Sequence, residues 1–142
     1  MDADKDYALL AQLLMQVQND DAVVIGITEL LSALARRCPY GVKNPAEKPE
    51  IVEAIYSMLR AQYRRDLQIV GANTLTSFAV GLENSQKFQY LLIPSDVIDQ
   101  LFDMACGEGN IFTSGITAIC HFLYQGLLIQ SSAITIIDVC LR

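Results

Sequence analysis

Tryptophan is absent from this sequence of 142 residues, and histidine occurs once. A single histidine leaves little material for acid–base catalysis or for a histidine-based metal site. The four cysteines are widely spaced and form none of the close cysteine or histidine pairs that zinc sites require. This composition predicts neither a metal nor a cofactor, and the thiols are expected to be reduced and mostly buried.

Long apolar runs are also missing. No stretch approaches the roughly 18 uninterrupted apolar residues of a membrane-spanning helix. The first residues, Met1 to Asp6, are acidic and polar, unlike the basic start and apolar centre of a signal peptide. The sequence therefore predicts an intracellular, cytoplasmic protein that does not bind a membrane, with the nucleus as an open alternative.

Basic residues are scarce in the carboxyl half. Residues 1–65 carry 8 basic and 9 acidic groups, whereas residues 66–142 carry 2 basic and 7 acidic groups, a difference of 2 − 7 = −5. Nucleic-acid binding needs a concentrated basic face, and the one basic cluster is Arg60, Arg64 and Arg65. We interpret this cluster as a solvated helix end and predict no nucleic-acid partner.

The hydrophobic content of 52% is high enough for burial to offset the entropy lost on folding. At this length the chain is expected to form one domain over residues 1–142.

An internal repeat organises the chain. Three segments, 21–35, 66–80 and 110–124, align on their internal glycines, Gly26, Gly71 and Gly115, which are 45 and 44 residues apart. A large aliphatic residue follows each glycine by four positions, and the residue seven positions after it lies on the same helical face. The positions concerned are Leu30, Leu75 and Ile119, then Ala33, Phe78 and Phe122. Each segment is therefore predicted to be an amphipathic helix, with its glycine allowing a neighbouring helix to approach closely.

A second set of segments alternates with the first. Apolar residues after Pro49 match those after Pro94 at a constant offset of 46, and proline suits the first turn of a helix. Gly81 is predicted to end a helix. Helices are expected at about 6–18, 21–37, 49–64, 66–81, 95–106, 109–125 and 131–141, with a short one at 83–93. These make a partial unit, 1–18, and three repeats at about 19–64, 66–106 and 109–142.

The best-preserved unit consists of a short helix carrying Asn84 and Lys87, a proline-led helix from Pro94, a small-residue corner at Gly107 and a longer helix centred on Gly115. This arrangement resembles an armadillo repeat. The resemblance covers residues 19–125 in outline, and a HEAT-type repeat is the second choice. It implies an all-α, right-handed α-solenoid.

Armadillo proteins of the importin-alpha type bind extended peptides through a tryptophan and an asparagine four residues apart. The resemblance places the tryptophan positions at Thr28, Asn73 and Thr117, and the asparagine positions at Ser32, Ser77 and His121. Because the chain has no tryptophan, that peptide-clamping ladder is absent. The same six residues are nevertheless expected to line a concave groove that binds a protein or peptide.

Two other patterns bear on chemistry. Cys120 and His121 are neighbours, but adjacent helical side chains point about 100° apart, so we expect Cys120 in the core and His121 in the groove. Asp96, Asp99 and Asp103 follow one side of a helix and are interpreted as a solvated acidic face, which favours a basic partner.

The sequence therefore predicts a non-enzymatic protein-interaction scaffold. The first alternative is self-assembly, including a homodimer, through terminal helices that expose Leu9, Leu13, Ile134 and Ile137. The second is a small helical enzyme, for which the catalytic inventory is nearly empty.

Overall fold

The computed structural model describes residues 3–16, 20–37, 44–62, 64–85 and 93–124, and within these ranges every regular element is a helix. The all-helical prediction is thus confirmed. The elements are α1 (Ala3–Gln16), α2 (Asp21–Arg36), the 3₁₀ turn η1 (Pro45–Glu47), α3 (Pro49–Arg60), α4 (Arg65–Ser85), α5 (Ser95–Ala105) and α6 (Gly109–Tyr124).

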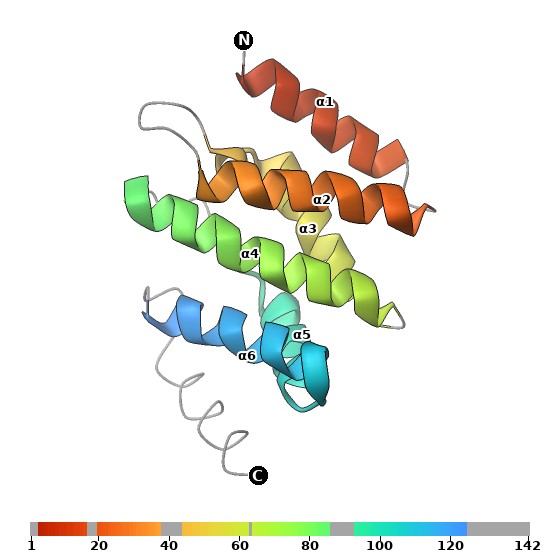
Figure 1. Cartoon of the computed structure of the whole chain (residues 1–142), viewed down its shortest axis with the longest axis vertical. Helices are drawn as coiled ribbons and strands as arrows, with labels where there is room; N and C mark the ends of the chain where they lie inside the picture. The colour runs from red at the N-terminus through yellow and green to blue at the C-terminus, as the bar shows by residue number, and fades with distance from the viewer. Residues whose placement is uncertain (1–2, 17–19, 38–43, 63, 86–92, 125–142) are drawn as a thin grey trace.

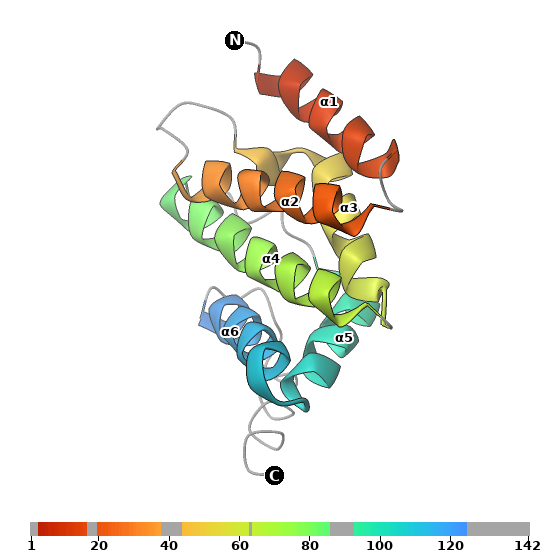
Figure 2. The ribbon, with the colours of Figure 1, turned by 45° about the vertical axis from the view of Figure 1, so that its right-hand side comes forward.

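Two layers of helices build the molecule. Helices α2, α4 and α6 lie side by side and run in the same direction (Figure 1), with α2 packed on α4 and α4 on α6. Helix α3 packs on α4, and α5 on α6, so these two form a second layer behind the first (Figure 2). Helix α1 packs mainly on α3 and touches α2 only slightly. As a result, α4 is covered by neighbours on several sides, whereas α2 packs mainly on α4.

Local signals explain most helix starts. The Asp20 side chain accepts a hydrogen bond from Val23 N at 3.3 Å and caps α2. Pro49 occupies the first turn of α3, where a missing N–H costs nothing. Pro94 is the residue immediately before α5. The predicted helix starts agree with the observed ones to within about three residues, while α3 ends at Arg60, short of the predicted 64.

Gly81 does not end a helix, which corrects the prediction. It lies buried inside α4, which continues to Ser85. A Cβ atom at Gly81 would collide with Ala35 O and would lie 2.6 Å from Asn44 Nδ2. That amide already donates to Ala35 O at 3.0 Å, which satisfies a carbonyl at the end of α2. The glycine is therefore required by the contact between α2, α4 and η1. The expected helices over 83–93, beyond Ser85, and over 131–141 lie outside the described residues.

The second and third predicted repeats bury equivalent residues. Leu75 and Ile119 are 0% exposed, and so are Phe78 and Phe122. A Cβ atom at Gly115 would lie 2.8 Å from Met104 Cβ and 3.1 Å from Leu101 O. One at Gly71 would lie 3.4 Å from Met58 Cβ. The predicted close approach of a neighbouring helix is confirmed at Gly115, whereas at Gly71 an added Cβ atom would make an ordinary van der Waals contact with α3.

Helix α2 departs from this pattern. Gly26 has open space around its Cα, and Leu30, predicted to lie in the core, is 50% exposed. Ala33 is exposed as well, while Val24 and Thr28 are buried instead. The expectation that Gly26 admits a close neighbour is therefore wrong. The cause is the position of α1, which packs on α3 and leaves this side of α2 uncovered.

Candidate functional site

The polar residues expected in a groove belong to the layer of α2, α4 and α6. Ser32 Oγ donates to Ser77 Oγ at 2.6 Å, across a sequence separation of 45 residues. Ser77 Oγ in turn donates to Asn73 O at 3.1 Å, within α4. The fold thus brings together Ser32 of α2 with Ser77 and Asn73 of α4.

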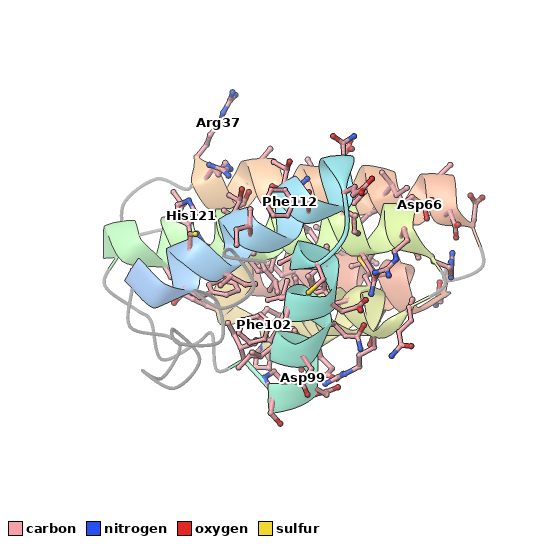
Figure 3. The ribbon with its side chains drawn as sticks, turned by 90° about the horizontal axis from the view of Figure 1, so that it is seen from below. Arg37, Asp66, Asp99, Phe102, Phe112 and His121 are labelled. Atoms are coloured by element: carbon pink, nitrogen blue, oxygen red, sulfur yellow. The ribbon has the colours of Figure 1, made fainter. Side chains whose placement is uncertain are left out.

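Helix α6 extends the same surface. Thr117 is exposed and His121 is partly exposed. Figure 3 shows His121 on the same side of the molecule as Asp66 of α4. Asn73 is exposed on α4, between the other two helices. The exposed polar side chains of α2, α4 and α6 therefore lie on the same side of the molecule.

Thr28 does not belong to this surface, which corrects its assignment to the groove. Its side chain is 0% exposed, its hydroxyl donates to Val24 O at 2.7 Å, and Met58 Sδ lies 3.5 Å away. The hydroxyl is satisfied within its own helix, so the residue packs as a core side chain. Thr28 is buried because α2 turns this side toward α3 and α4.

Ser77 is also buried, at 1% exposure, and it serves as a link between helices. Besides the bond from Ser32, its oxygen accepts one from Arg36 Nε at 2.7 Å. Arg36 was missed in the sequence analysis. The available signal was its spacing, because Arg36 follows Ser32 by one helical turn and so shares its face. We define the polar strip as Ser32, Arg36, Asn73, Thr117 and His121.

The three arginines of the basic cluster are engaged in ion pairs. Arg60 Nε lies 2.7 Å from Asp96 Oδ2, and its NH1 lies 2.7 Å from Glu53 Oε1. Arg65 NH2 lies 3.1 Å from Asp103 Oδ2, and Arg64 pairs with Asp21. The interpretation as a merely solvated helix end is therefore incomplete. These arginines connect the corner between α3 and α4 to α5 and α2, with the modest strength of exposed ion pairs.

These pairs also change the meaning of the acidic face on α5. The hydrogen bonds from Arg60 lower the pKa of Asp96 below its ordinary value. Asp103 is paired with Arg65, while Asp99 is exposed. Figure 3 shows Asp99 on the opposite side of the molecule from His121. Much of this acidic face is thus neutralised within the chain, and it lies away from the polar strip.

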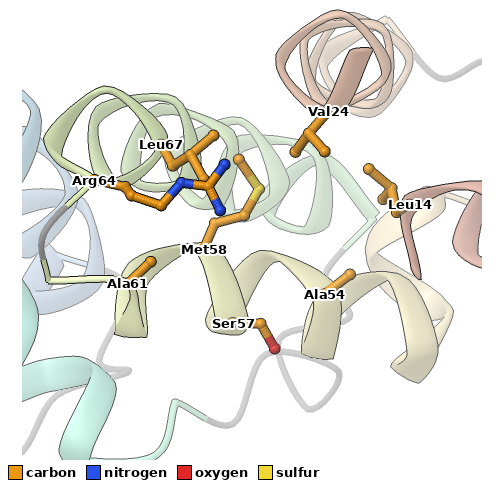
Figure 4. Close-up of a pocket in the computed structure, with 8 residues that line it drawn as sticks. All are labelled: Leu14, Val24, Ala54, Ser57, Met58, Ala61, Arg64 and Leu67. Carbon is orange, nitrogen blue, oxygen red and sulfur yellow. The ribbon is translucent and has the colours of Figure 1, made fainter. Parts of the chain in front are cut away.

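A cavity of about 260 Å³ lies where α1, α2, α3 and α4 meet (Figure 4). Its lining is mainly apolar, and the Arg64 guanidinium projects beside Met58 and Leu67. Ligand sites usually measure roughly 300–1,000 Å³ and hold several convergent polar groups. This cavity is smaller, and its one charged group is already paired with Asp21. We interpret it as loose packing at the junction with α1.

The groups considered for catalysis are dispersed. Cys120 is exposed, so the expectation that it packs in the core is wrong; Ala118, Ile119 and Phe122 fill the buried side of α6 instead. Cys106 is exposed too, and Cys38 and Cys140 lie outside the described residues. Tyr56 of α3 is buried, and this burial raises the pKa of its phenol. The charge of the nearby Glu53 raises the pKa further, so the phenol stays neutral.

The described part of the chain holds no group of three His, Cys, Asp or Glu side chains arranged to bind a metal ion. Among the same residues, no helix combines the length and apolar content needed to cross a lipid bilayer.

The comparisons with known proteins found no match. No protein-family model, no characterised protein and no solved structure shows significant similarity to this chain.

Proposed function

We propose that this protein is a helical-repeat scaffold of the armadillo type that binds an extended protein segment along its polar strip. The fold supports this proposal through α4 and α6, which bury equivalent residues and receive equivalent neighbours. Met58 of α3 contacts Gly71, and Met104 of α5 contacts Gly115. Helix pairs that pack on one another in this way build the elongated surfaces of repeat proteins.

The observation that carries the proposal is the hydrogen bond between Ser32 and Ser77. These serines are 45 residues apart, the spacing of Gly26 and Gly71, so they occupy equivalent positions of neighbouring repeats. Equivalent positions in contact across a layer form a row that runs from helix to helix. Such a row matches the backbone of an extended segment lying across the helices.

The chemistry of the polar strip suits polar contacts. It offers hydroxyls at Ser32 and Thr117, an amide at Asn73, a guanidinium at Arg36 and an imidazole at His121. Together these groups can donate hydrogen bonds to, and accept them from, a partner's peptide groups and polar side chains. A preference for basic partners was expected from the acidic face of α5. Because that face lies opposite and is largely paired, we propose recognition by hydrogen bonding, without a requirement for basic residues.

Enlarging the exposed residues of the strip tests the proposal. The double variant Asn73→Leu/Thr117→Leu removes an amide and a hydroxyl and fills the space above two adjacent helices. Both positions are exposed, so the fold should persist. We expect proteins that co-purify with the wild-type chain from its native lysate to be lost with this variant.

The matched control is Asp99→Leu, which places the same side chain on the opposite side of the molecule. It should retain every partner that the wild-type chain captures. Retention of the partners by the double variant would contradict the proposal, and so would their loss from both variants.

The role that we propose is binding without catalysis. Because adjacent helical side chains point about 100° apart, we expect no nucleophile-and-base pair between the Cys120 thiol and the His121 imidazole.

A further inference from the structure

An apolar stripe runs along the outer side of α2. Val23 is 41% exposed, Leu30 is 50% exposed and Leu34 is 39% exposed, while Ile27 is partly buried between them. We call these four residues the outer stripe. Their spacing of four, three and four residues places them on one face of the helix. An aliphatic row of this kind is normally covered, either by the same chain or by a partner.

The corresponding residues of α4 and α6 are covered by a neighbouring helix, unlike those of α2. Leu75 of α4 and Ile119 of α6 occupy the position of Leu30, and both are 0% exposed. A Cβ atom added at Gly71 or Gly115 would meet a neighbouring helix, whereas one added at Gly26 would meet no atom of another element within 4 Å. Among the described residues, no helix therefore covers the side of α2 that carries these aliphatic side chains.

The outer stripe is symmetric about the midpoint between Thr28 and Glu29. Its spacing reads the same in both directions, so a second α2 can lie antiparallel across it. Val23 then faces Leu34 of the second copy, and Ile27 faces its Leu30. Two-fold contacts require this self-complementarity, because the same patch must serve both partners.

The charges at the two ends of α2 fit the same arrangement. Asp20 and Arg37 are equally distant from the midpoint and both are exposed. Arg37 extends away from the molecule in Figure 3. Of the adjacent charges, Asp21 pairs with Arg64, and Arg36 Nε donates to Ser77 on the side of the polar strip. An antiparallel pair of α2 helices brings Asp20 of each copy to Arg37 of the other.

We propose that two copies of this chain associate through antiparallel contact of their α2 outer stripes, with Asp20–Arg37 pairs at both ends. Ser32 and Arg36 lie on a different side of α2, so the association leaves the polar strip open. This dimer goes beyond the proposed function and does not depend on it.

Oligomeric state is the first test. Light scattering and sedimentation from micromolar to near-millimolar concentration should give twice the mass of the chain for the wild type. Leu30→Glu should weaken association by about tenfold or more, because each dimer would bury two unpaired carboxylates. Circular dichroism should show that the variant stays folded, since Leu30 is half exposed. Phe112→Glu is the matched control, because Phe112 is a 40% exposed apolar residue on α6, and it should not affect association.

The antiparallel register has its own test. Mixing a Val23→Cys chain with a Leu34→Cys chain under mild oxidation should give a disulfide between positions 23 and 34, identified by mass spectrometry of the linked peptides. Val23→Cys alone should not link to itself through this position, because the two copies of residue 23 would lie about 16 Å apart along the helix axis.

Three outcomes would overturn the proposal. The first is a wild-type chain that stays monomeric at all concentrations, whether or not α1 or another protein covers the outer stripe. The second is a dimer unaffected by Leu30→Glu. The third is efficient linkage of residue 23 to itself, which indicates a parallel arrangement.

Discussion

Glycine has opposite consequences at two positions that the sequence makes equivalent. Gly115 lies against Met104 and the backbone of Ala105, where a Cβ atom would come within 2.9 Å of Ala105 N. A Cβ atom added at Gly26 would meet no atom of another element within 4 Å, so the cost of this glycine to the helix is not offset by a close contact. The sequence pattern alone treats both as places of close approach. The difference arises from which helix packs beside each one.

Substituting alanine separates the two cases. Gly26→Ala should raise the free energy of unfolding by about 0.5–1 kcal/mol, because alanine favours the helix and restricts the unfolded chain. Gly115→Ala should lower it by roughly 1–3 kcal/mol, because the added methyl overpacks the contact with α5. Urea titration at a concentration where the chain is monomeric measures both. Stabilisation by both substitutions would show that α5 yields easily to the added methyl.

Polar residues show the same dependence on surroundings. Thr28, Asn73 and Thr117 hold equivalent sequence positions, yet Thr28 is buried while the other two are exposed. A small polar side chain suits either environment, since the threonine hydroxyl can bond to its own helix. Residue type at these positions therefore could not determine exposure.

At the scale of the element, Gln68 joins three helices. Its side chain on α4 is 0% exposed, and its Nε2 donates to Leu59 O at 2.7 Å and to Gln100 Oε1 at 3.3 Å. Its Oε1 accepts from Arg65 NH1 at 2.8 Å. Leu59 O is one of the last carbonyls of α3, which have no partner within the helix. Gln68 thus satisfies the end of α3 and connects it to α5.

Removing this amide should destabilise the fold. Gln68→Leu leaves the carbonyl of Leu59 and the amide of Gln100 without their donor, which costs about 1–3 kcal/mol. The midpoint of urea unfolding should fall accordingly. Gln62→Leu is the matched control, because it makes the same change at an exposed glutamine just before α4, and it should change stability by less than about 0.5 kcal/mol. Equal losses of stability from the two substitutions would argue against the proposed role of Gln68 in linking α3, α4 and α5.

For helix α2, the sequence predicts the position of the helix and leaves its buried side undetermined. Its position was predictable, since Asp20 caps it and apolar residues recur along it. Its buried side was not, because aliphatic residues occur on both sides. Val24 and Leu31 are buried, while Leu30 and Leu34 are exposed. Helical periodicity identifies one face only when the other is polar.

At the scale of the whole molecule, α4 is the central element. Helices α2, α3 and α6 all pack on it, and most side chains between Gly71 and Leu82 are buried. Helix α1 lies at the edge, with Leu9 at 56% exposure. Stability should therefore decrease from the centre of the molecule toward α1.

Amide hydrogen exchange can measure this gradient. We expect the slowest exchange in α4, at rates set by global unfolding, and exchange in α1 faster by at least about tenfold, through local opening. Mass spectrometry of peptic fragments from the full chain resolves the two helices. Equal protection of α1 and α4 would contradict the gradient and would indicate that α1 is held by further contacts.

The sequence by itself determined the all-helical class and most helix starts, because proline, capping residues and a 3.6-residue apolar period act within one element. Only the tertiary structure decided which side of α2 is buried, that α1 packs on α3, and that Arg36 meets Ser77. It also decided that Gly81 lies within a helix, against Ala35 of α2. These features depend on contacts between residues far apart in the chain, whose geometry no local pattern contains.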